Sequence, residues 1–267
     1  MVPESIYLAT DKNLSSYEQG VLDRAVQMSV PIFSLGPGVV DRVSDAQSPQ
    51  GVLSVFSQLD VGLEKIVAPT NLNTNEGDQL LLGPTNGNQP GVTDSHQGAR
   101  LGGPLVVCVG VRDPGNAGTI MRSAAGFGSP GVIFCEGCVD PYNPKTLRSS
   151  AGAIFQVPIS VDTSVGQVID LLGDRGYVKI GTSSHCSRSV FDVDLTGRVA
   201  VFVGNEARGI ESDMAGKFDY TIGVPLDRDL ESLNVAVACS VILAEAMRQR
   251  LVAVRPTFTP SSEPLAL

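Results

Sequence analysis

The stretch that decides the fold of this chain runs from Val199 to Gln249. It contains three runs, V-A-V-F-V-G-N-E-A-R-G-I at 199–210, Y-T-I-G-V-P-L at 220–226 and E-S-L-N-V-A-V-A-C-S-V-I-L-A-E-A-M-R at 231–248. Short β-branched segments bounded by Gly or Pro predict buried strands at Val199–Val203 and Tyr220–Val224. Ser232 or Asn234 can cap the helix that follows. Two strand ends and one helix start therefore converge on polar loops, which predicts a ligand site at the edge of an α/β sheet.

The helix predicted after this cap is apolar or small around its circumference over Val235–Ala244. A helix of that composition is expected to be buried on every side. Small side chains at Ala236, Ala238 and Ser240 let neighbouring backbones approach closely. The residues alone leave two explanations open, burial inside one subunit and burial between two.

Outward from this stretch, residues 103–182 alternate between strand and helix signals. The predicted strands are Leu105–Val111, Gly131–Cys135, Phe155–Ile159 and Tyr177–Thr182, and the predicted helices are 113–127, Pro144–Ser150 and Ser164–Arg175. Alternation of this kind predicts a largely parallel, doubly wound sheet with helices on both faces.

The N-terminal 59 residues form a second, smaller α/β pattern. Strands are predicted at Ser5–Ala9, Val30–Leu35 and Gly51–Phe56, and helices at Ser15–Met28 and Gly36–Val43. The stretch 61–100 is rich in Asn and Gly and lacks sustained periodicity, apart from a short apolar run at Leu80–Leu82. The predicted organisation is a small α/β domain at 1–59, a linker or insertion at 60–102, a large α/β domain at 103–252 and a tail at 253–267.

The composition narrows the classes of partner. The chain of 267 residues has a net charge of −9, which argues against a protein that coats nucleic acid non-specifically. An RNA partner must therefore be held by local basic patches, which a second subunit can complete. No apolar run is long enough to span a membrane, and no segment resembles a signal peptide, so a cytoplasmic location is expected.

The cysteines and histidines of the sequence give little support for a metal site or for the catalytic triad of a hydrolase. Five cysteines at irregular spacing fit free thiols in a reducing compartment. Cys135 and Cys138 form a CxxC pair without a second ligand pair, so a turn with two ordinary thiols is favoured over zinc, and no metal site is predicted. The sequence contains neither a dinucleotide fingerprint nor a Walker A motif, and only two histidines.

Three stretches resemble the motifs of one family. They are N-A-G-T-I-M-R-S-A-A-G-F-G at 116–128, F-V-G-N-E-A-R-G-I at 202–210, and V-P-L at 224–226 with S-L-N-V-A at 232–236. In order, spacing and flanking strands they are similar to the SpoU, or TrmH, branch of the SPOUT RNA 2′-O-ribose methyltransferases. The resemblance covers roughly residues 104–250. Less clearly, the first 57 residues resemble the small L30e-like substrate-binding domain common in this family, although such domains usually have a further strand and helix before the position where this chain begins.

The resemblance implies a fold, a partner and a reaction. The fold is a parallel-sheet domain with a C-terminal trefoil knot, in which the last helix is tucked through the loop after Thr182, preceded by an L30e-like domain. The implied assembly is a homodimer with the helix Ser232–Gln249 near the interface. The implied reaction moves a methyl group from S-adenosylmethionine to a ribose 2′-hydroxyl of ribosomal or transfer RNA, not DNA. The alternative is a catalytically idle RNA-binding or ribosome-associated scaffold of the same fold.

The resemblance also implies site residues. The cofactor-binding residues would be Thr182, Gly204, Asn205, Val224, Leu226, Ser232 and Leu233. The catalytic residues would be Asn116, Arg122, Glu206, Ser232 and Asn234. A scaffold has no need of all five polar side chains of the second set, so their presence favours the enzyme.

Arg122 is the base for the 2′-hydroxyl in common descriptions of the family, but energetics favour another role. Lowering a guanidinium pKa from about 13 to about 7 costs roughly 8 kcal/mol. Holding a phosphate bidentately needs no such shift and still orients the nucleophile. We therefore expect Arg122 to position phosphate or ribose first and to act as base second.

Overall fold

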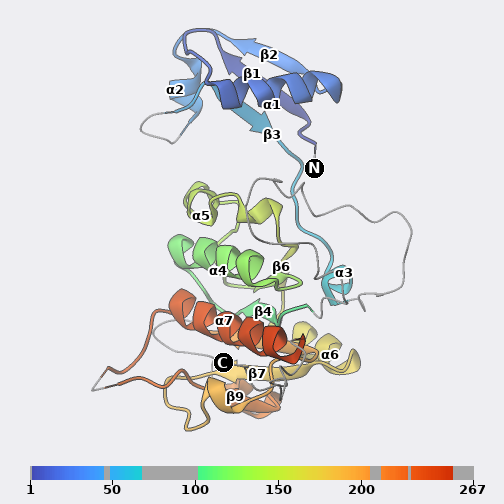
Figure 1. The fold of residues 1–267 in the computed structure, drawn as a ribbon, viewed down its shortest axis with the longest axis vertical. Coiled ribbons are helices and arrows are strands. Elements are labelled where there is room, and N and C mark those ends of the chain that lie inside the picture. Colours follow the sequence, from blue (N-terminus) through green and yellow to red (C-terminus); the bar gives the residue numbers. More distant parts are fainter. Residues whose placement is uncertain (1, 45–48, 68–101, 205–211, 228–229, 255–267) are drawn as a thin grey trace, which may run out of the picture. The chain divides into compact units, whose positions relative to one another are not determined.

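The computed structural model describes residues 2–44, 49–67, 102–204, 212–227 and 230–254. These residues form two compact units, the first ending at Leu59 and the second beginning at Asp60 (Figure 1). No helix in the described ranges is both long and apolar enough to cross a membrane.

The first unit is a three-stranded sheet with a helix packed on it. Its strand order is β2-β1-β3, with β1 parallel to β2 and antiparallel to β3. Ile6 of β1 packs with Leu22 and Ala25 of α1, which makes the small core. The elements are β1 Ser5–Ala9, α1 Ser16–Gln27, β2 Ile32–Leu35, α2 Val39–Val43 and β3 Val52–Val55. The helices and strands predicted here are confirmed to within a few residues.

The second unit contains a six-stranded sheet with the order β6-β5-β4-β8-β7-β9, and every neighbouring pair is parallel. The strands are β4 Leu105–Cys108, β5 Val132–Cys135, β6 Ile159–Thr163, β7 Val178–Thr182, β8 Val199–Val203 and β9 Tyr220–Ile222. β8 is buried along its whole length because it lies between β4 and β7. The predicted parallel α/β sheet is therefore confirmed.

Helices cover this sheet. Leu105 and Val107 of β4 pack against residues of α3 and α6, so these two helices cover one face. Alternate residues of a strand point to the other face, where Cys108 lies near Cys239 of α7. Helix α7 packs on α4, which packs on α5 (Figure 1). The α-helices are α3 Leu63–Val67, α4 Pro114–Phe127, α5 Pro144–Ser150, α6 Val165–Asp174 and α7 Val235–Val254, and short 3₁₀ helices are η1 Ala153–Phe155, η2 Val190–Asp192 and η3 Ser212–Lys217.

Two sequence predictions differ from the structure in this unit. The strand expected at Phe155–Ile159 begins only at Ile159, because η1 occupies the start of the range and Pro158 has no N–H to donate to a ladder. The segment expected to be a linker from residue 60 contains α3, whose Ile66 and Val67 are buried in the core of the second unit. Residues 68–101, which include Leu80–Leu82, lie outside the described residues.

For α7 the sequence left open whether the helix is buried inside one subunit or between two, and a single chain does not bury it on every side. Val237 and Leu251 are exposed at 47% and 48%. They lie on one helical stripe with Val241 and Ala244, which are half-buried, and with the exposed Arg248, so the stripe is apolar except at that position. The opposite side of α7, with Cys239 and others, is buried. A single chain therefore leaves one apolar stripe of this helix without cover from the described residues.

The backbones of α4 and α5 approach each other closely at Gly118. A Cβ at this position would lie 1.8 Å from Ser149 Oγ and 2.6 Å from the backbone nitrogen of Ser150. Ser149 Oγ also donates to the Pro114 carbonyl at 2.8 Å. Only glycine fits at residue 118, and it sets the position of α5 relative to the start of α4.

We expect Gly118→Ala to destabilise the protein by about 1–3 kcal/mol, because the added methyl group meets backbone that cannot move away. The matched control is Gly126→Ala in the same helix, where an added Cβ has nothing within 4 Å. That control should raise stability by up to about 1 kcal/mol through helix propensity. Urea denaturation measures both changes, and equal effects of the two substitutions would contradict the close-packing argument.

Candidate functional site

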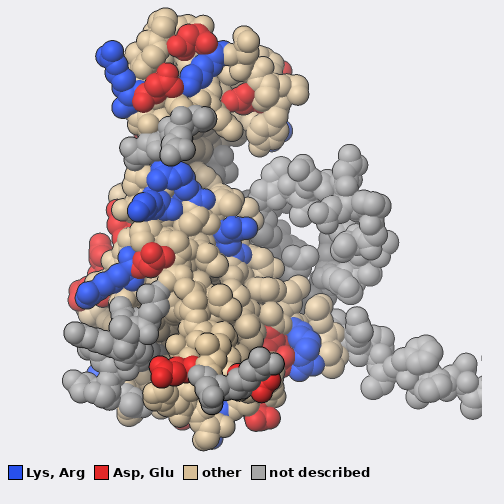
Figure 2. Space-filling model, turned by 90° about the vertical axis from the view of Figure 1, so that its left-hand side faces the viewer, with Lys and Arg blue, Asp and Glu red and all other residues tan. Residues whose placement is uncertain are grey.

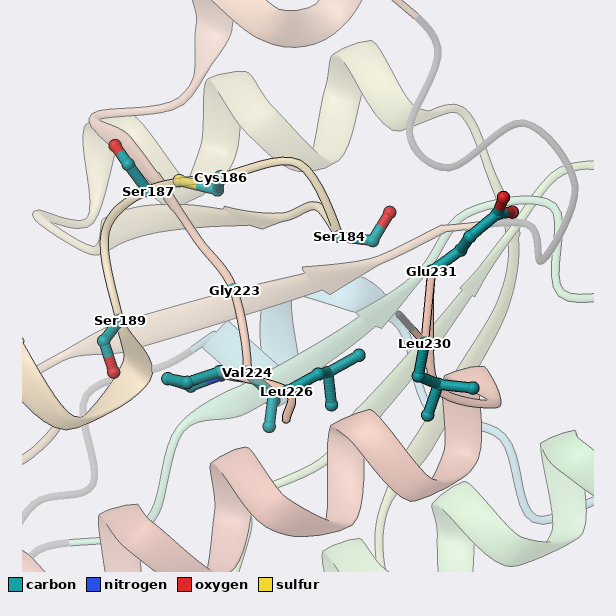
Figure 3. Close-up of a pocket in the computed structure, with 10 residues that line it drawn as sticks. Ser184, Cys186, Ser187, Ser189, Gly223, Val224, Leu226, Leu230 and Glu231 are labelled. Carbon is teal, nitrogen blue, oxygen red and sulfur yellow. The ribbon is translucent and has the colours of Figure 1, made fainter. Parts of the chain in front are cut away.

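A pocket of about 270 Å³ lies where β7 and β9 end (Figure 3). This is the edge at which parallel α/β sheets place their ligands. Its walls come from the loop after β7, the segment after β9 and the residues that lead to α7. The lining residues are Ser184, Cys186, Ser187, Ser189, Gly223, Val224, Pro225, Leu226, Leu230 and Glu231.

Backbone hydrogen bonds hold two walls of this pocket together. Gly223 N donates to Arg188 O at 2.9 Å, and Val190 N donates to Gly223 O at 2.9 Å. A Cβ on Gly223 would lie 2.9 Å from Ser183 O, so glycine is needed for this approach. The loop after β7 is therefore tied to the end of β9 by main-chain contacts, independently of side-chain identity.

The lining combines apolar and polar groups. Val224 and Leu226 form an apolar wall, and the side chains of Ser184 and Ser187 offer hydroxyl groups (Figure 3). Glu231 is the one charged residue among the lining residues that the structure describes. Such a pocket suits a ligand with a flat apolar part, hydrogen-bonding groups and a positive charge.

A second cluster forms where α4 and α7 begin. Asn234 Nδ2 donates to Asn116 Oδ1 at 2.9 Å, across a sequence separation of 118 residues. Asn234 Oδ1 accepts from the backbone nitrogens of Ala236 at 2.9 Å and Val237 at 3.3 Å, so Asn234, rather than Ser232, caps α7. One amide side chain therefore caps one helix and fixes the Asn116 side chain in the first turn of another.

The structure places the predicted catalytic residues as follows. Asn116 and Asn234 are in direct contact. Ser232 is exposed two residues before the cap. Arg122 is exposed on α4, and no carboxylate among the described residues lies within ion-pair distance of it. Glu206 lies outside the described residues.

Only some of the predicted cofactor-binding residues line the pocket. Val224 and Leu226 line the pocket. Thr182 ends β7, where its Oγ1 donates to Phe202 O at 2.9 Å, and Gly204 is buried directly after β8. Ser232 and Leu233 follow the pocket residue Glu231 in the chain but do not line the pocket, and Asn205 lies outside the described residues.

Sequence reasoning missed part of the lining. Ser184, Ser187 and Ser189 belong to a loop of small polar residues that directly follows a strand. A cluster of small polar residues at the end of a strand was the sequence signal that could have identified them as pocket residues. Glu231 carried no comparable signal, because a single acidic residue before a helix usually serves the helix dipole.

Of the CxxC pair, Cys135 ends β5 and Cys138 lies in the turn that follows. Burial raises the pKa of Cys135 to about 12, so its thiol keeps its proton at neutral pH. Cys138 Sγ donates to the Cys108 carbonyl at 3.2 Å. In the described ranges, His, Cys, Asp and Glu form no group of three that could hold a metal ion.

Comparison with known proteins defines the class to which this fold and site belong. The model of the SpoU rRNA Methylase family matches residues 103–244. The chain belongs to this family. The match includes the six strands of the second unit, the pocket and the starts of α4 and α7.

Individual relatives agree with the family. The chain is 38% identical over 143 residues to a 23S rRNA (uridine(2479)-2′-O)-methyltransferase of Streptomyces viridochromogenes, a match that covers 52% of this chain and 50% of that protein. The chain thus spans about half the length of that relative. It is 30% identical to the 23S rRNA (guanosine-2′-O-)-methyltransferase RlmB of Coxiella burnetii, over 86% of this chain and 92% of that protein.

A solved structure is also similar. The SpoU methyltransferase AviRb of Streptomyces viridochromogenes, crystallised with the cofactor AdoMet, superimposes with a TM-score of 0.71 at 27% identity. The superposition covers 94% of this chain and 84% of that one.

The two roles of Asn234 can be separated by substitution. Asn234→Ala removes the cap and should lower stability by about 0.5–2 kcal/mol. Asn234→Ser keeps a capping oxygen but lacks the amide that donates to Asn116, so its stability should stay within about 0.5 kcal/mol of the wild type. Thermal denaturation of both variants checks this, and an equal loss in both would mean that the bridge, rather than the cap, stabilises the fold.

Proposed function

We propose that the protein transfers a methyl group from S-adenosylmethionine to a ribose 2′-hydroxyl of RNA, with ribosomal RNA as the leading substrate. The observation that carries the proposal is the Asn116–Asn234 bridge beside a strand-end pocket, in a chain of the SpoU family. The names of the relatives, which specify 23S rRNA 2′-O-methylation, support the substrate class. An idle scaffold would not need a fixed polar pair at this position.

The pocket fits S-adenosylmethionine by its chemistry. The wall of Val224 and Leu226 suits the adenine ring, and the backbone groups at the ends of β7, β8 and β9 offer hydrogen bonds. The Glu231 carboxylate suits a cofactor that carries a positive sulfonium. When bound there, the cofactor supplies an electrophilic methyl group. Thr182, Gly204, Asn205, Ser232 and Leu233 complete the proposed cofactor-binding set.

The proposed acceptor site lies at the start of α4. Asn116, held by Asn234, presents its amide to the ribose. Arg122 holds a phosphate or the ribose in a bidentate contact, so that the 2′-hydroxyl is oriented for attack. Glu206 and Ser232 are the further polar residues of the proposed catalytic set.

The proposal also includes two features of the fold, a knot in the second unit and an RNA-binding role for the first. The first is a trefoil knot around α7. Gln249 supports it, because its side chain accepts from Leu195 N and donates to Val193 O, both at 2.9 Å, which ties the C-terminal half of α7 to the connection between β7 and β8. A crystal structure that traces residues 205–211 tests the knot.

The second feature is the role of the first unit as an L30e-like RNA-binding domain. Its separate compact core supports an independent role. Deletion of residues 1–59 should then weaken RNA binding and leave cofactor binding intact, and equal RNA affinity with and without this unit would contradict the assignment.

Cofactor binding should not require RNA, because the described pocket is built from the second unit alone. Calorimetry of the full chain with S-adenosylhomocysteine should give measurable heat. Glu231→Gln should weaken the binding of S-adenosylmethionine by up to about fivefold, the effect expected for an exposed ion pair. The binding of S-adenosylhomocysteine, the uncharged thioether product, should weaken less. A folded wild-type protein that binds neither compound would overturn the pocket assignment.

A homodimer is proposed from the exposed stripe of α7, in which Val237 and Leu251 are about half exposed. Light scattering at micromolar concentration should give the mass of two chains. Val237→Glu should shift the equilibrium between monomer and dimer toward the monomer, because the dimer interface would then bury a charge. The matched control is Val26→Glu, at a position that is 65% exposed on α1. A wild-type protein that is monomeric at this concentration would contradict the proposal.

The role of Arg122 can be tested with Arg122→Lys, which keeps the charge but loses the planar fork. If Arg122 positions phosphate or ribose, methyl transfer should fall by about 10- to 1,000-fold with unchanged cofactor affinity. The pH–rate profile should keep its shape, because another group or water takes the proton. If Arg122 were the base, the lower pKa of Lys would move the rising limb to lower pH. A shift of more than about one pH unit would refute the positioning role.

A further inference from the structure

The charges of the second unit are unevenly distributed. The whole chain has a net charge of −9, yet α4 and α5 contain no Asp or Glu. Their charged side chains are Arg122 on α4 and Lys145 and Arg148 on α5, and Arg112 lies two residues before α4. Figure 2 shows several Lys and Arg on the upper part of the second unit, with some Asp and Glu beside them at its left flank and others near its lower edge.

These four cations have no acidic partner among the described residues, and unlike other unpaired cations of the unit, such as Lys65 and Lys217, they lie on or next to two packed helices that contain no Asp or Glu. All four are exposed, and within the described ranges none lies within ion-pair distance of a carboxylate. By contrast, Arg175 pairs with Glu64, Lys179 with Asp219 and Arg248 with Glu245, at 2.7, 3.5 and 2.7 Å.

The acidic residues nearest in sequence are already engaged with backbone. Asp113 Oδ1 accepts from Asn116 N at 2.8 Å, and Asp140 Oδ1 accepts from Tyr142 N at 2.8 Å. Neither carboxylate forms an ion pair with a cation of α4 or α5, so these cations are open to an external anion.

Helix α5 is held rigidly next to the proposed acceptor site. The Gly118 contact and the bond from Ser149 to Pro114 fix α5 on the first turns of α4. Arg122 follows Gly118 by one helical turn, so its side chain leaves α4 on the side that faces α5. Lys145 and Arg148, three residues apart, share one face of α5 with Cβ atoms about 5–6 Å apart.

We propose that Lys145 and Arg148 of α5, together with Arg112 and Arg122, form the track along which the phosphate backbone of the substrate RNA crosses the methyltransferase unit. We call these four residues the α5 track. The inference rests on the proposed function, because Arg122 joins the track to the acceptor site. It explains how an acidic protein holds RNA: four exposed cations gather beside the site on a surface whose two helices contain no Asp or Glu.

The test compares two double variants that remove the same charge from the same unit. Lys145→Ala/Arg148→Ala alters the track. Lys65→Ala/Lys217→Ala is the control, because both lysines are exposed, lie outside α4 and α5, and have no ion-pair partner among the described residues. The probe is a fluorescein-labelled single-stranded 20-nucleotide RNA of mixed sequence, followed by anisotropy between 50 and 200 mM salt. Calorimetry with S-adenosylhomocysteine and thermal melting accompany each variant.

Each phosphate contact on single-stranded RNA contributes about 0.7 to the slope of log affinity against log salt. The track variant should therefore lose about 1.4 from the slope and bind the probe more weakly at low salt. The control should keep the wild-type slope, and both variants should bind S-adenosylhomocysteine as the wild type does. Should the alanine variant melt early, Lys145→Gln/Arg148→Gln replaces it.

An unchanged slope in the track variant, or an equal loss in the control, overturns the track. Failure of the proposed function has a different signature, which is wild-type protein that binds RNA but neither S-adenosylmethionine nor S-adenosylhomocysteine. In that case, a selective loss of slope in the track variant would still establish the surface.

Discussion

The hydrogen bond from Asn234 to Asn116 is the contact on which the candidate site depends. It joins the first turns of α4 and α7, which are 118 residues apart in sequence. The same Asn234 side chain satisfies two backbone nitrogens at the start of α7. Because both of its polar atoms are engaged, Asn234 cannot rotate to serve other partners, and the Asn116 amide is held in one orientation. The positive ends of two helix dipoles are thereby brought to one place, which suits an anionic substrate.

Packing at Gly118 extends this arrangement to α5. Since glycine allows α5 to lie directly on α4, the helix that carries Lys145 and Arg148 is positioned by the same turns that carry Asn116. The pocket is built differently, because its two walls are joined by main-chain bonds around Gly223. Cofactor and RNA would therefore meet at a junction of two rigid parts, one fixed by helix packing and the other by strand-end hydrogen bonds.

Much of this architecture could be predicted from the sequence because its signals are local. Val199–Val203 is a continuous apolar run with Val at every other position, and such apolar runs are typical of central parallel strands. The predicted start of β6 was wrong because an apolar run such as that around Phe155 fits a strand as well as the 3₁₀ turn that it forms here. Helix α3 is only five residues long, too short to show a helical period. The contact between Asn116 and Asn234 depends on which helices are neighbours, and no local pattern carries that information.

The central place of β8 in the sheet affects how the protein folds during its synthesis on the ribosome. β4, β5 and β6 are complete by Thr163, and β7 by Thr182, but β7 reaches β4 only through β8. Until Val199–Val203 has left the exit tunnel, β4 has an unpaired edge and β7 has no neighbour on either side, because β9 also follows β8 in the chain. β8 therefore joins β7 to the rest of the sheet, and an incomplete chain that stops before it leaves edges of β4 and β7 open to pairing with other chains.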